Sequence, residues 1–279
     1  MRDLSNDTRS LSLNTATIGP ARSLEDAVEG CLRHGLGGIS PWRDKIAEVG
    51  LARAARLVRD AGLAVTGVCR GGMFTGADLP ARHRALDENR RAVDEAATLA
   101  AACLVLVVGG LPAGSRDLAG ARRQVEDGIA ATLEYARSVK VPLALEPLHP
   151  MYAADRACVN TLAQALDVCD RCGPGLGVVI DVYHVWWDPD LHAGIGRAGR
   201  NGQLLAYHVC DWLASTRDLL LDRGMMGDGV VDLRGIRRSV EAAGYQGLCE
   251  VEIFSDRNWW KRSVDEILSA VVERGRACV

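Results

Sequence analysis

The sequence predicts one α/β domain, a (β/α)8 TIM barrel that spans residues 1–279. Short apolar β-like segments alternate with longer amphipathic segments along the chain, which is the pattern of a parallel sheet covered by helices. Eight such units are present, and eight parallel strands can close into a barrel. The length of 279 residues suits one such domain, and no linker or low-complexity stretch divides it.

The strands are expected where Val, Ile, Leu and Ala gather, and the helices where apolar residues recur at helical spacing. Ser23 with Asp26 and Asn160 with Gln164 resemble helix starts, and several amphipathic segments end in glycine, a common helix C-cap. We expect strands at 11–18, 37–42, 64–71, 103–110, 141–148, 175–185, 204–212 and 247–254, and helices at 23–35, 51–62, 82–101, 121–140, 160–173, 233–244 and 263–275.

The alternative α/β architecture is a doubly wound open sheet. Such sheets usually carry a glycine fingerprint after the first strand. Here the first predicted strand is followed by Gly19-Pro20-Ala21-Arg22, which lacks that fingerprint. The barrel is therefore favoured.

Composition and charge narrow the class of protein. Hydrophobic residues make up 48% and charged residues 25%, as in ordinary globular proteins. The net charge of -3 offers no basic field for nucleic acid or an anionic membrane, and no apolar run approaches the roughly 20 residues of a membrane span. The first ten residues are polar and unlike a signal peptide, so we expect a cytoplasmic protein.

The nine cysteines are scattered, and several lie inside apolar runs. This distribution indicates reduced, buried thiols rather than a disulfide framework. Cys169 and Cys172 form the one close pair, and no second pair completes a zinc site. We expect both to be helix-packing residues.

Ionisable residues lie near the ends of the last four predicted strands. Because the active sites of barrels form where the strands end, these side chains should meet at one rim. A carboxylate in an apolar strand is costly unless it is paired or bound to a metal. Three carboxylates and one imidazole suit one divalent cation; Mn²⁺ is favoured, with Mg²⁺, Co²⁺ or Zn²⁺ as alternatives. The expected ligands are Glu146, Asp181, His208 and Glu252.

The eighth strand offers two carboxylates, Glu250 and Glu252, on the same side of the strand. Glu252 is nearer the C-terminal end and is the preferred ligand. Glu250 lies deeper and is expected to form a buried ion pair, without an assigned role in the chemistry.

These residues and their spacing carry a resemblance to a known family. They are Leu-Glu146-Pro, Asp181-x-x-His184, His208, Arg223 followed by Gly227-Asp-Gly229, and Gly244-Tyr-x-Gly247 followed by Glu252. The chain resembles the xylose isomerase-like TIM barrel superfamily of sugar phosphate isomerases and epimerases. Within it, the nearest branch holds ketose 3-epimerases, hydroxypyruvate isomerases and inosose dehydratases.

The resemblance implies a role for each matching residue. Glu146, Asp181, His208 and Glu252 would bind the metal, and His184 and Arg223 would contact substrate. It also implies a homo-oligomer, a dimer or a tetramer. One departure stands out, because epimerases of this branch carry a further glutamate after the strand-five ligand, where this chain has 147–152 without a carboxylate.

Three further residues near strand ends are candidates for substrate binding. Trp42 and Arg43 follow the second predicted strand, and Arg70 lies near the end of the third. Their side chains would line the mouth of the barrel, where the arginines could bind hydroxyls, a carboxylate or a phosphate.

The expected activity is that of a divalent-metal-dependent sugar isomerase or epimerase. It would remove a proton next to a carbonyl through a metal-stabilised enediolate, with Glu146 and Glu252 as base and acid. The alternative is a metal-dependent lyase or dehydratase that performs β-elimination on a keto-cyclitol or 3-keto-glycoside, with His149 as the acid. The substrate is a carbohydrate-like small molecule in both cases.

Two other functions fit less well. A sugar-binding barrel without turnover has no need of four metal ligands. Endonuclease IV shares the superfamily fold, but it needs a histidine-rich trinuclear zinc site and a DNA-binding surface. Six histidines and a net charge of -3 argue against that function.

Overall fold

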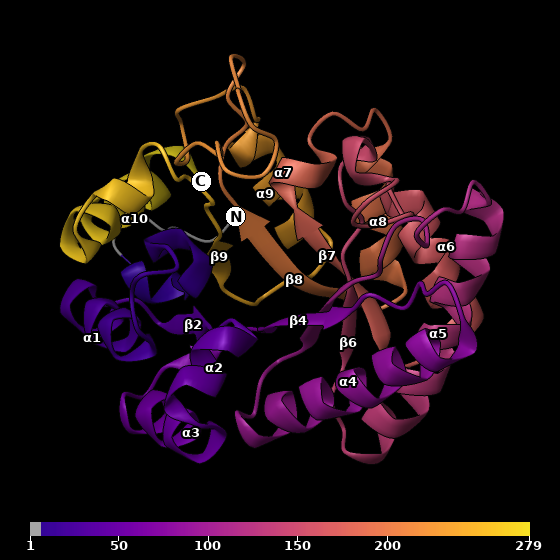
Figure 1. Ribbon diagram of the computed structural model, residues 1–279. Helices are drawn as coiled ribbons and strands as arrows, with labels where there is room; N and C mark the ends of the chain where they lie inside the picture. Colours follow the sequence, from indigo (N-terminus) through magenta and orange to yellow (C-terminus); the bar gives the residue numbers. More distant parts are fainter. Residues whose placement is uncertain (1–6) are drawn as a thin grey trace.

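The computed structural model describes residues 7–279 and folds them into a barrel of parallel strands surrounded by helices (Figure 1). The strand order is β3-β2-β1-β9-β8-β7-β6-β5-β4, and every neighbouring pair is parallel. The strands are β1 (Leu11–Asn14), β2 (Gly38–Ser40), β3 (Ala64–Val65), β4 (Val68–Gly72), β5 (Leu104–Val107), β6 (Leu143–Leu145), β7 (Leu176–Asp181), β8 (Leu204–Val209) and β9 (Cys249–Val251). The prediction of a single-domain TIM barrel is confirmed.

The predicted third strand is split into two strands. Its first part, β3, pairs with β2, and its second part, β4, pairs with β5. The two parts therefore stand at the two ends of the strand order, and a parallel bridge links Trp42, just after β2, with Cys69 of β4. The eight predicted strands thus correspond to nine hydrogen-bonded segments and an almost closed ring.

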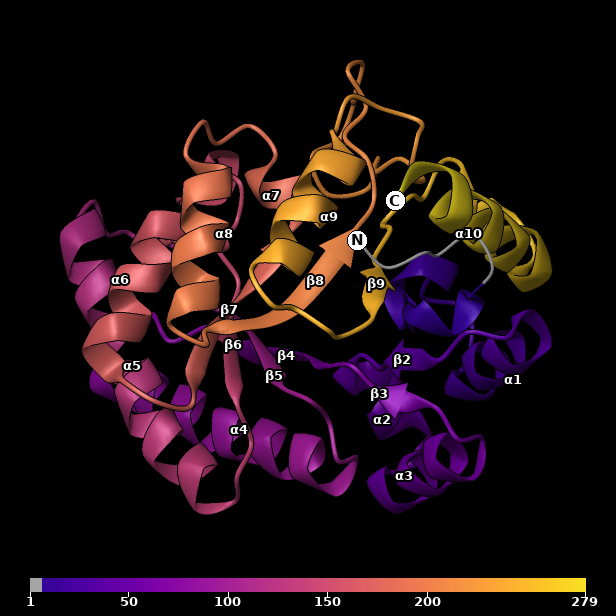
Figure 2. The same cartoon turned by 180° about the vertical axis from the view of Figure 1, so that it is seen from behind.

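The helices form the outer layer in both views of the molecule (Figures 1 and 2). They are α1 (Leu24–His34), α2 (Arg43–Val49), α3 (Leu51–Asp60), α4 (Leu79–Thr98), α5 (Leu118–Ser138), α6 (Leu162–Cys172), α7 (Val182–Val185), α8 (Leu191–Arg200), α9 (Leu233–Ala242) and α10 (Val264–Cys278), with short 3-10 turns at Thr8–Ser10, Thr15–Ile18, Pro150–Tyr152 and Trp259–Lys261. None of the helices in the described part of the chain is both long and apolar enough to cross a bilayer.

Local capping explains where several helices begin. Ser23 and Asp26 form a capping box at the start of α1, as predicted. The expected start near Asn160 is displaced by one residue, because the side chain of Thr161 accepts the hydrogen bond from the backbone N–H of Gln164.

The structure contains α8, which the sequence pattern did not predict. Its glycines lower helix propensity, which hides the helix in the sequence. They are needed for packing, since a Cβ on Gly194 would lie 2.7 Å from Leu162 and one on Gly199 would lie 2.3 Å from the carbonyl oxygen of Ala243. The short α2 was also missed.

Several strands end earlier than predicted because a side chain turns the backbone. After β1, Asn14 accepts a hydrogen bond from the N–H of Ala16 at 3.0 Å, and a 3-10 turn follows. After β7, Asp181 accepts one from the N–H of Tyr183 at 2.8 Å, and α7 follows. The polar residues that end these strands are therefore fixed at the C-terminal rim of the barrel.

The apolar core has two parts. The larger part lies between the sheet and the helices, and the smaller part fills the barrel interior with Cys69, Cys103, Val105, Ala144, Val179 and Ala206. All nine cysteines are unpaired and mostly buried, so the described residues contain no disulfide framework. Four of the six interior residues are Ala or Val, and the rim just above them carries the polar cluster described next.

Candidate metal centre

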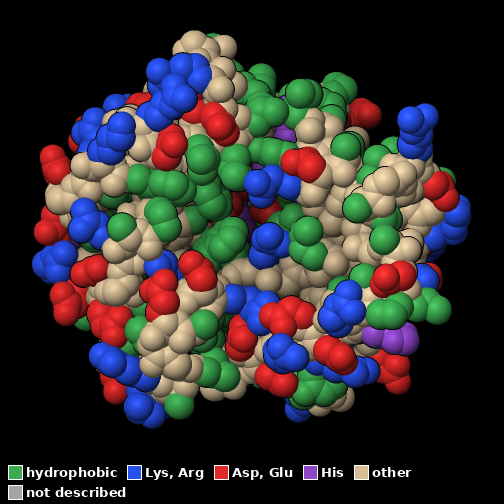
Figure 3. Space-filling view, viewed as in Figure 1, with side chains coloured by type: hydrophobic (Ala, Val, Ile, Leu, Met, Phe, Trp, Pro, Cys, Tyr) green, Lys and Arg blue, Asp and Glu red, His purple; other side chains and the backbone are tan. Residues whose placement is uncertain are grey.

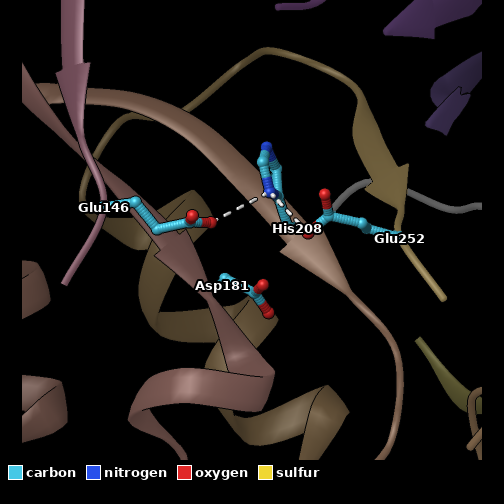
Figure 4. Close-up of side chains that lie close together, drawn as sticks. All are labelled: Glu146, Asp181, His208 and Glu252. Carbon is cyan, nitrogen blue, oxygen red and sulfur yellow. Dashed lines mark ion pairs between the residues drawn. The ribbon is translucent and has the colours of Figure 1, made fainter. Parts of the chain in front are cut away.

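Four ionisable side chains converge at the C-terminal rim (Figure 4). Glu146 directly follows β6, Asp181 ends β7, His208 lies near the end of β8, and Glu252 directly follows β9. Asp181 is the register partner of His208, so the parallel pairing of β7 and β8 places them side by side. One ligand atom from each of the four residues lies within 4.8 Å of the others.

The geometry of this cluster leaves polar atoms without partners. Nδ1 of His208 lies 3.6 Å from Oε1 of Glu146 and 3.6 Å from Oε2 of Glu252 (Figure 4). Oε1 of Glu146 and both ring nitrogens of His208 are buried and make no hydrogen bond of good geometry. Buried polar atoms of this kind are costly, and a cation bound between them would satisfy them.

Arg223 connects the cluster to the loop that follows β8. Its Nη1 donates to Oδ2 of Asp181 at 3.0 Å and lies 3.3 Å from Oε2 of Glu252. Its Nη2 lies 3.2 Å from Nε2 of His184, and the guanidinium packs over Tyr183 at 4.3 Å. Arg223 is thus buried beside two of the carboxylates, and its Nε has no hydrogen-bond partner.

Glu250 lies on the other side of His208. His208 and Glu250 are register partners on β8 and β9, and Oε1 of Glu250 lies 3.4 Å from Nε2 of His208. Asn14 donates to Oε1 of Glu250 at 2.7 Å and to Oε1 of Glu252 at 3.0 Å. Thr66 donates to Oε2 of Glu250 at 2.7 Å. The end of β1 and the residue that follows β3 therefore support the cluster through neutral side chains.

Burial and charge separate the pKa values of the two glutamates. Burial raises the pKa of Glu146 to about 7, although His208 opposes this rise. Burial also disfavours the ionised form of Glu252, but His208 and Arg223 outweigh it and lower the pKa to about 2. Burial opposes a charge on His208, yet Glu250, Glu146 and Glu252 raise its pKa well above the usual value. The pocket attracts positive charge.

A cavity of about 460 Å³, its open mouth included, lies directly above the cluster. In the space-filling view, acidic and histidine side chains appear inside the central hollow, and basic side chains stand at its rim (Figure 3). The polar or charged lining residues are Arg70, Glu146, Tyr152, Arg156, His184, Arg223 and Glu252, and the apolar wall includes Trp42, Leu148, Leu220 and Phe254.

The model of one protein family matches residues 26–270, nearly the whole chain, and its description is "Xylose isomerase-like TIM barrel". The chain belongs to this family. No curated protein matches the chain.

Solved structures share the fold of this family member. A structure of protein SMc04130 from Sinorhizobium meliloti 1021 is 61% identical, with 98% of this chain and 99% of that chain covered and a TM-score of 0.96. The IolI protein with a bound zinc atom is 19% identical, with 95% and 96% covered and a TM-score of 0.82. The 3-keto-D-glucoside 4-epimerase YcjR from E. coli, in its apo form, is 18% identical, with 96% and 99% covered and a TM-score of 0.76.

Of the residues of this chain that were expected to bind substrate, four line the cavity: Trp42, Arg70, His184 and Arg223. Arg43 is directed elsewhere. Its guanidinium pairs with Glu95 at 2.5 Å and with Glu88 at 2.8 Å, both on α4, and it is not among the residues that line the cavity. Arg43 therefore holds α2 against α4.

His149 also lies outside the cavity lining. Its ring stacks on Trp212 with centroids 4.8 Å apart, and its Nδ1 accepts a hydrogen bond from the N–H of Met151. Its backbone N–H donates to Nδ1 of His184 at 3.2 Å. His149 thus packs the loop after β6 against the wall behind His184.

The loop after β8 covers one side of the mouth, and buried Asp211 organises it. Its carboxylate accepts hydrogen bonds from the N–H groups of Trp212, Gly227 and Val231 at 2.9–3.0 Å. A Cβ on Gly229 would lie 2.0 Å from the carbonyl oxygen of Trp212, so this position requires glycine. The Gly-x-Gly segment therefore fixes the loop that carries Arg223.

Sequence reasoning missed several residues of the site. Asn14 and Thr66 are neutral, and nothing in their local sequence marks them as partners of Glu250. Arg156 is in a loop without a strand-end pattern, yet it lines the cavity.

Proposed function

We propose that Glu146, Asp181, His208 and Glu252 hold one divalent cation and that the protein is a sugar isomerase or epimerase. The observation that carries the proposal is the convergence of four ligand atoms within 4.8 Å, two of them on residues with unpartnered buried atoms. The oxygen-rich set favours Mn²⁺, and the zinc bound by the IolI protein makes Zn²⁺ the second candidate.

Two neighbours and the lining of the cavity support the proposed substrate class. Besides the 3-keto-D-glucoside 4-epimerase, a D-allulose 3-epimerase from Methylomonas sp. in complex with D-allulose shares the fold. One wall of the cavity is formed by Trp42 and Phe254, packed edge to face at 5.5 Å, and a few charged groups converge in it, as in sites for small polar molecules. A small keto-sugar is the proposed substrate.

Glu146 and Glu252 are the proposed proton carriers. They come from strands on different sides of β7 and β8, and their side chains approach the cluster from opposite directions (Figure 4). One carboxylate removes the proton from the carbon next to the carbonyl, and the other returns a proton to the neighbouring position or to the opposite face. When bound, the cation supplies a Lewis acid that stabilises the negative charge of the enediolate.

Arg223 and His184 complete the proposed site. Arg223 is buried beside Asp181 and Glu252 and lines the cavity. Burial lowers the pKa of His184 to about 3, so the ring is neutral, and it lines the cavity beside Arg223. Both residues would orient the substrate oxygens.

The experiment is a substrate screen in D2O with the Mn²⁺-loaded protein. Free ketoses, keto-cyclitols and 3-keto-glycosides are incubated separately, and products are followed by NMR. Isomerase or epimerase activity predicts deuterium at the carbon next to the carbonyl, and Glu252→Gln should abolish it. Turnover without deuterium in the product would contradict solvent-exchanging proton transfer, and release of water or an aglycone would favour the lyase alternative.

A further inference from the structure

Two arginines at the cavity mouth have no role in the cluster. Arg70 lies in β4, and Arg156 lies in the loop after the 3-10 turn Pro150–Tyr152. Both side chains are partly buried, and both line the cavity. They stand on the β4–β6 side of the barrel, whereas Arg223 enters from the loop after β8.

Within the described residues, these two arginines have few close carboxylate partners. Within residues 7–279, Arg70 makes no ion pair, and the ion pair of Arg156 is a long one, 3.9 Å to the exposed Asp155. The two guanidinium groups are close enough to repel each other: burial and then the charge of Arg156 lower the pKa of Arg70. Arg43, by contrast, is matched by Glu88 and Glu95.

The backbone holds Arg156 at the mouth. The carbonyl of Arg156 accepts a hydrogen bond from the N–H of Gly109 at 2.9 Å, and Ala157 forms a parallel bridge with Gly109. The guanidinium lies over the ring of Tyr152, 5.6 Å from its centroid. The position of this charge is therefore built into the pairing of the loops after β5 and β6.

We infer that Arg70 and Arg156 bind an anionic substituent, a carboxylate or a phosphate, on the sugar-like substrate. The inference rests on the proposed function for the substrate's sugar part. Like positive charges placed together beside a cavity repel a cation and favour an anion that bridges them over a neutral molecule. Among the cluster carboxylates, Asp181 and Glu252 pair with Arg223, and within the described residues none of the four ligands forms an ion pair with Arg70 or Arg156.

The test measures binding rather than turnover. Titration calorimetry at low ionic strength uses the Mn²⁺-loaded protein freed of excess metal. The probes are D-fructose, D-fructuronate and D-fructose 6-phosphate, which share a ketose and differ in charge, together with acetate and inorganic phosphate. The variants are Arg70→Met and Arg156→Met, and Arg84→Met on the exposed face of α4 is the matched control.

At least one charged ketose should bind about tenfold more tightly than D-fructose. Tighter binding of D-fructuronate would identify the anionic group as a carboxylate, and tighter binding of D-fructose 6-phosphate would identify it as a phosphate. Each of the two substitutions should remove this preference, and the control should keep it. If no ketose binds, acetate or inorganic phosphate must bind in a manner that depends on both arginines.

Equal affinities for all three ketoses would overturn the inference, and so would a preference that survives both substitutions or a lack of binding by every anion. Failure of the proposed function would look different. The D2O screen would then show no proton exchange, while the calorimetry would still show tighter binding of the charged ketose.

Discussion

Oε1 of Glu250 lies 3.4 Å from Nε2 of His208, while Nδ1 of the same ring faces Glu146 and Glu252 at 3.6 Å. The imidazole therefore lies between a supporting carboxylate and the proposed metal position. A carboxylate behind a metal-binding histidine fixes the orientation of the ring and makes its free nitrogen a better ligand. Asn14 and Thr66 hold Glu250 in place.

Glu250→Gln should weaken metal binding about 10–100-fold, because the amide keeps the shape but loses the charge. Competition with a fluorescent chelator measures the affinity for Mn²⁺. Glu126→Gln, which removes a carboxylate from an exposed pair with Arg171 on the outer surface, is the control. Unchanged metal affinity in Glu250→Gln would mean that Glu250 serves only as a buried partner of Asn14 and Thr66.

Metal removal should destabilise the fold. Three carboxylates lie beside one another at the rim, and a cation bound only by the folded state adds about 2.7 kcal/mol at a concentration of 100 Kd. For a chain of this size, that corresponds to a rise in Tm of roughly 5–10 °C when Mn²⁺ is added to EDTA-treated protein. Glu252→Ala should show neither the rise nor bound metal, and full metal occupancy in that variant would refute the ligand set.

Arg223→Lys tests whether this residue acts on the substrate or on the ligands. Lysine keeps the charge beside Asp181 and Glu252 but cannot make both the Nη1 and the Nη2 contacts of the guanidinium. We expect normal metal content and a decrease in kcat/KM of about tenfold or more. Elemental analysis and steady-state kinetics on the same preparation decide the matter. Loss of metal would assign Arg223 to the support of Asp181 and Glu252.

Much of this site could be predicted from the sequence because ionisable residues in apolar strands are conspicuous. Glu146, Asp181, His208 and Glu252 each interrupt such a strand or directly follow it, and the barrel geometry brings their ends together. The neutral partner Asn14 could not be found in this way, since its importance depends on the pairing of β1 with β9.

The fold was predicted more accurately than the boundaries of its strands and helices. Strand ends shifted where a side chain capped the following turn, as at Asp181. The helix Leu191–Arg200 was missed because its glycines serve packing against Leu162 and Ala243 rather than helix propensity. Likewise, the direction of Arg43 depends on Glu88 and Glu95, which lie more than 40 positions away in the chain.

The pH dependence of stability should include a contribution from His149. Burial lowers the pKa of His149 below 6.5, so the unfolded chain takes up a proton more readily than the folded protein. The contribution of the neutral His149 ring to the free energy of unfolding is therefore fully present above pH 6.5. It is lost as the pH falls toward the lowered pKa. Urea unfolding of EDTA-treated protein at pH 7.5 and 5.5 should show a smaller decrease in unfolding free energy for His149→Phe than for the wild type. An equal or larger decrease in the variant would contradict this assignment.

His149→Phe also separates epimerase from lyase chemistry. In the elimination alternative, His149 protonates the leaving group, which requires its ring to reach the substrate. The ring instead stacks on Trp212 outside the cavity lining, and phenylalanine can keep that stacking. We therefore expect turnover and proton exchange in D2O within about twofold of the wild-type rates, with Arg84→Met as a control for unrelated surface changes. The opposite result has a clear meaning, because elimination and epimerisation share the first proton transfer. If His149→Phe abolishes product formation but still exchanges the substrate proton next to the carbonyl, the protein is a lyase and His149 is its acid.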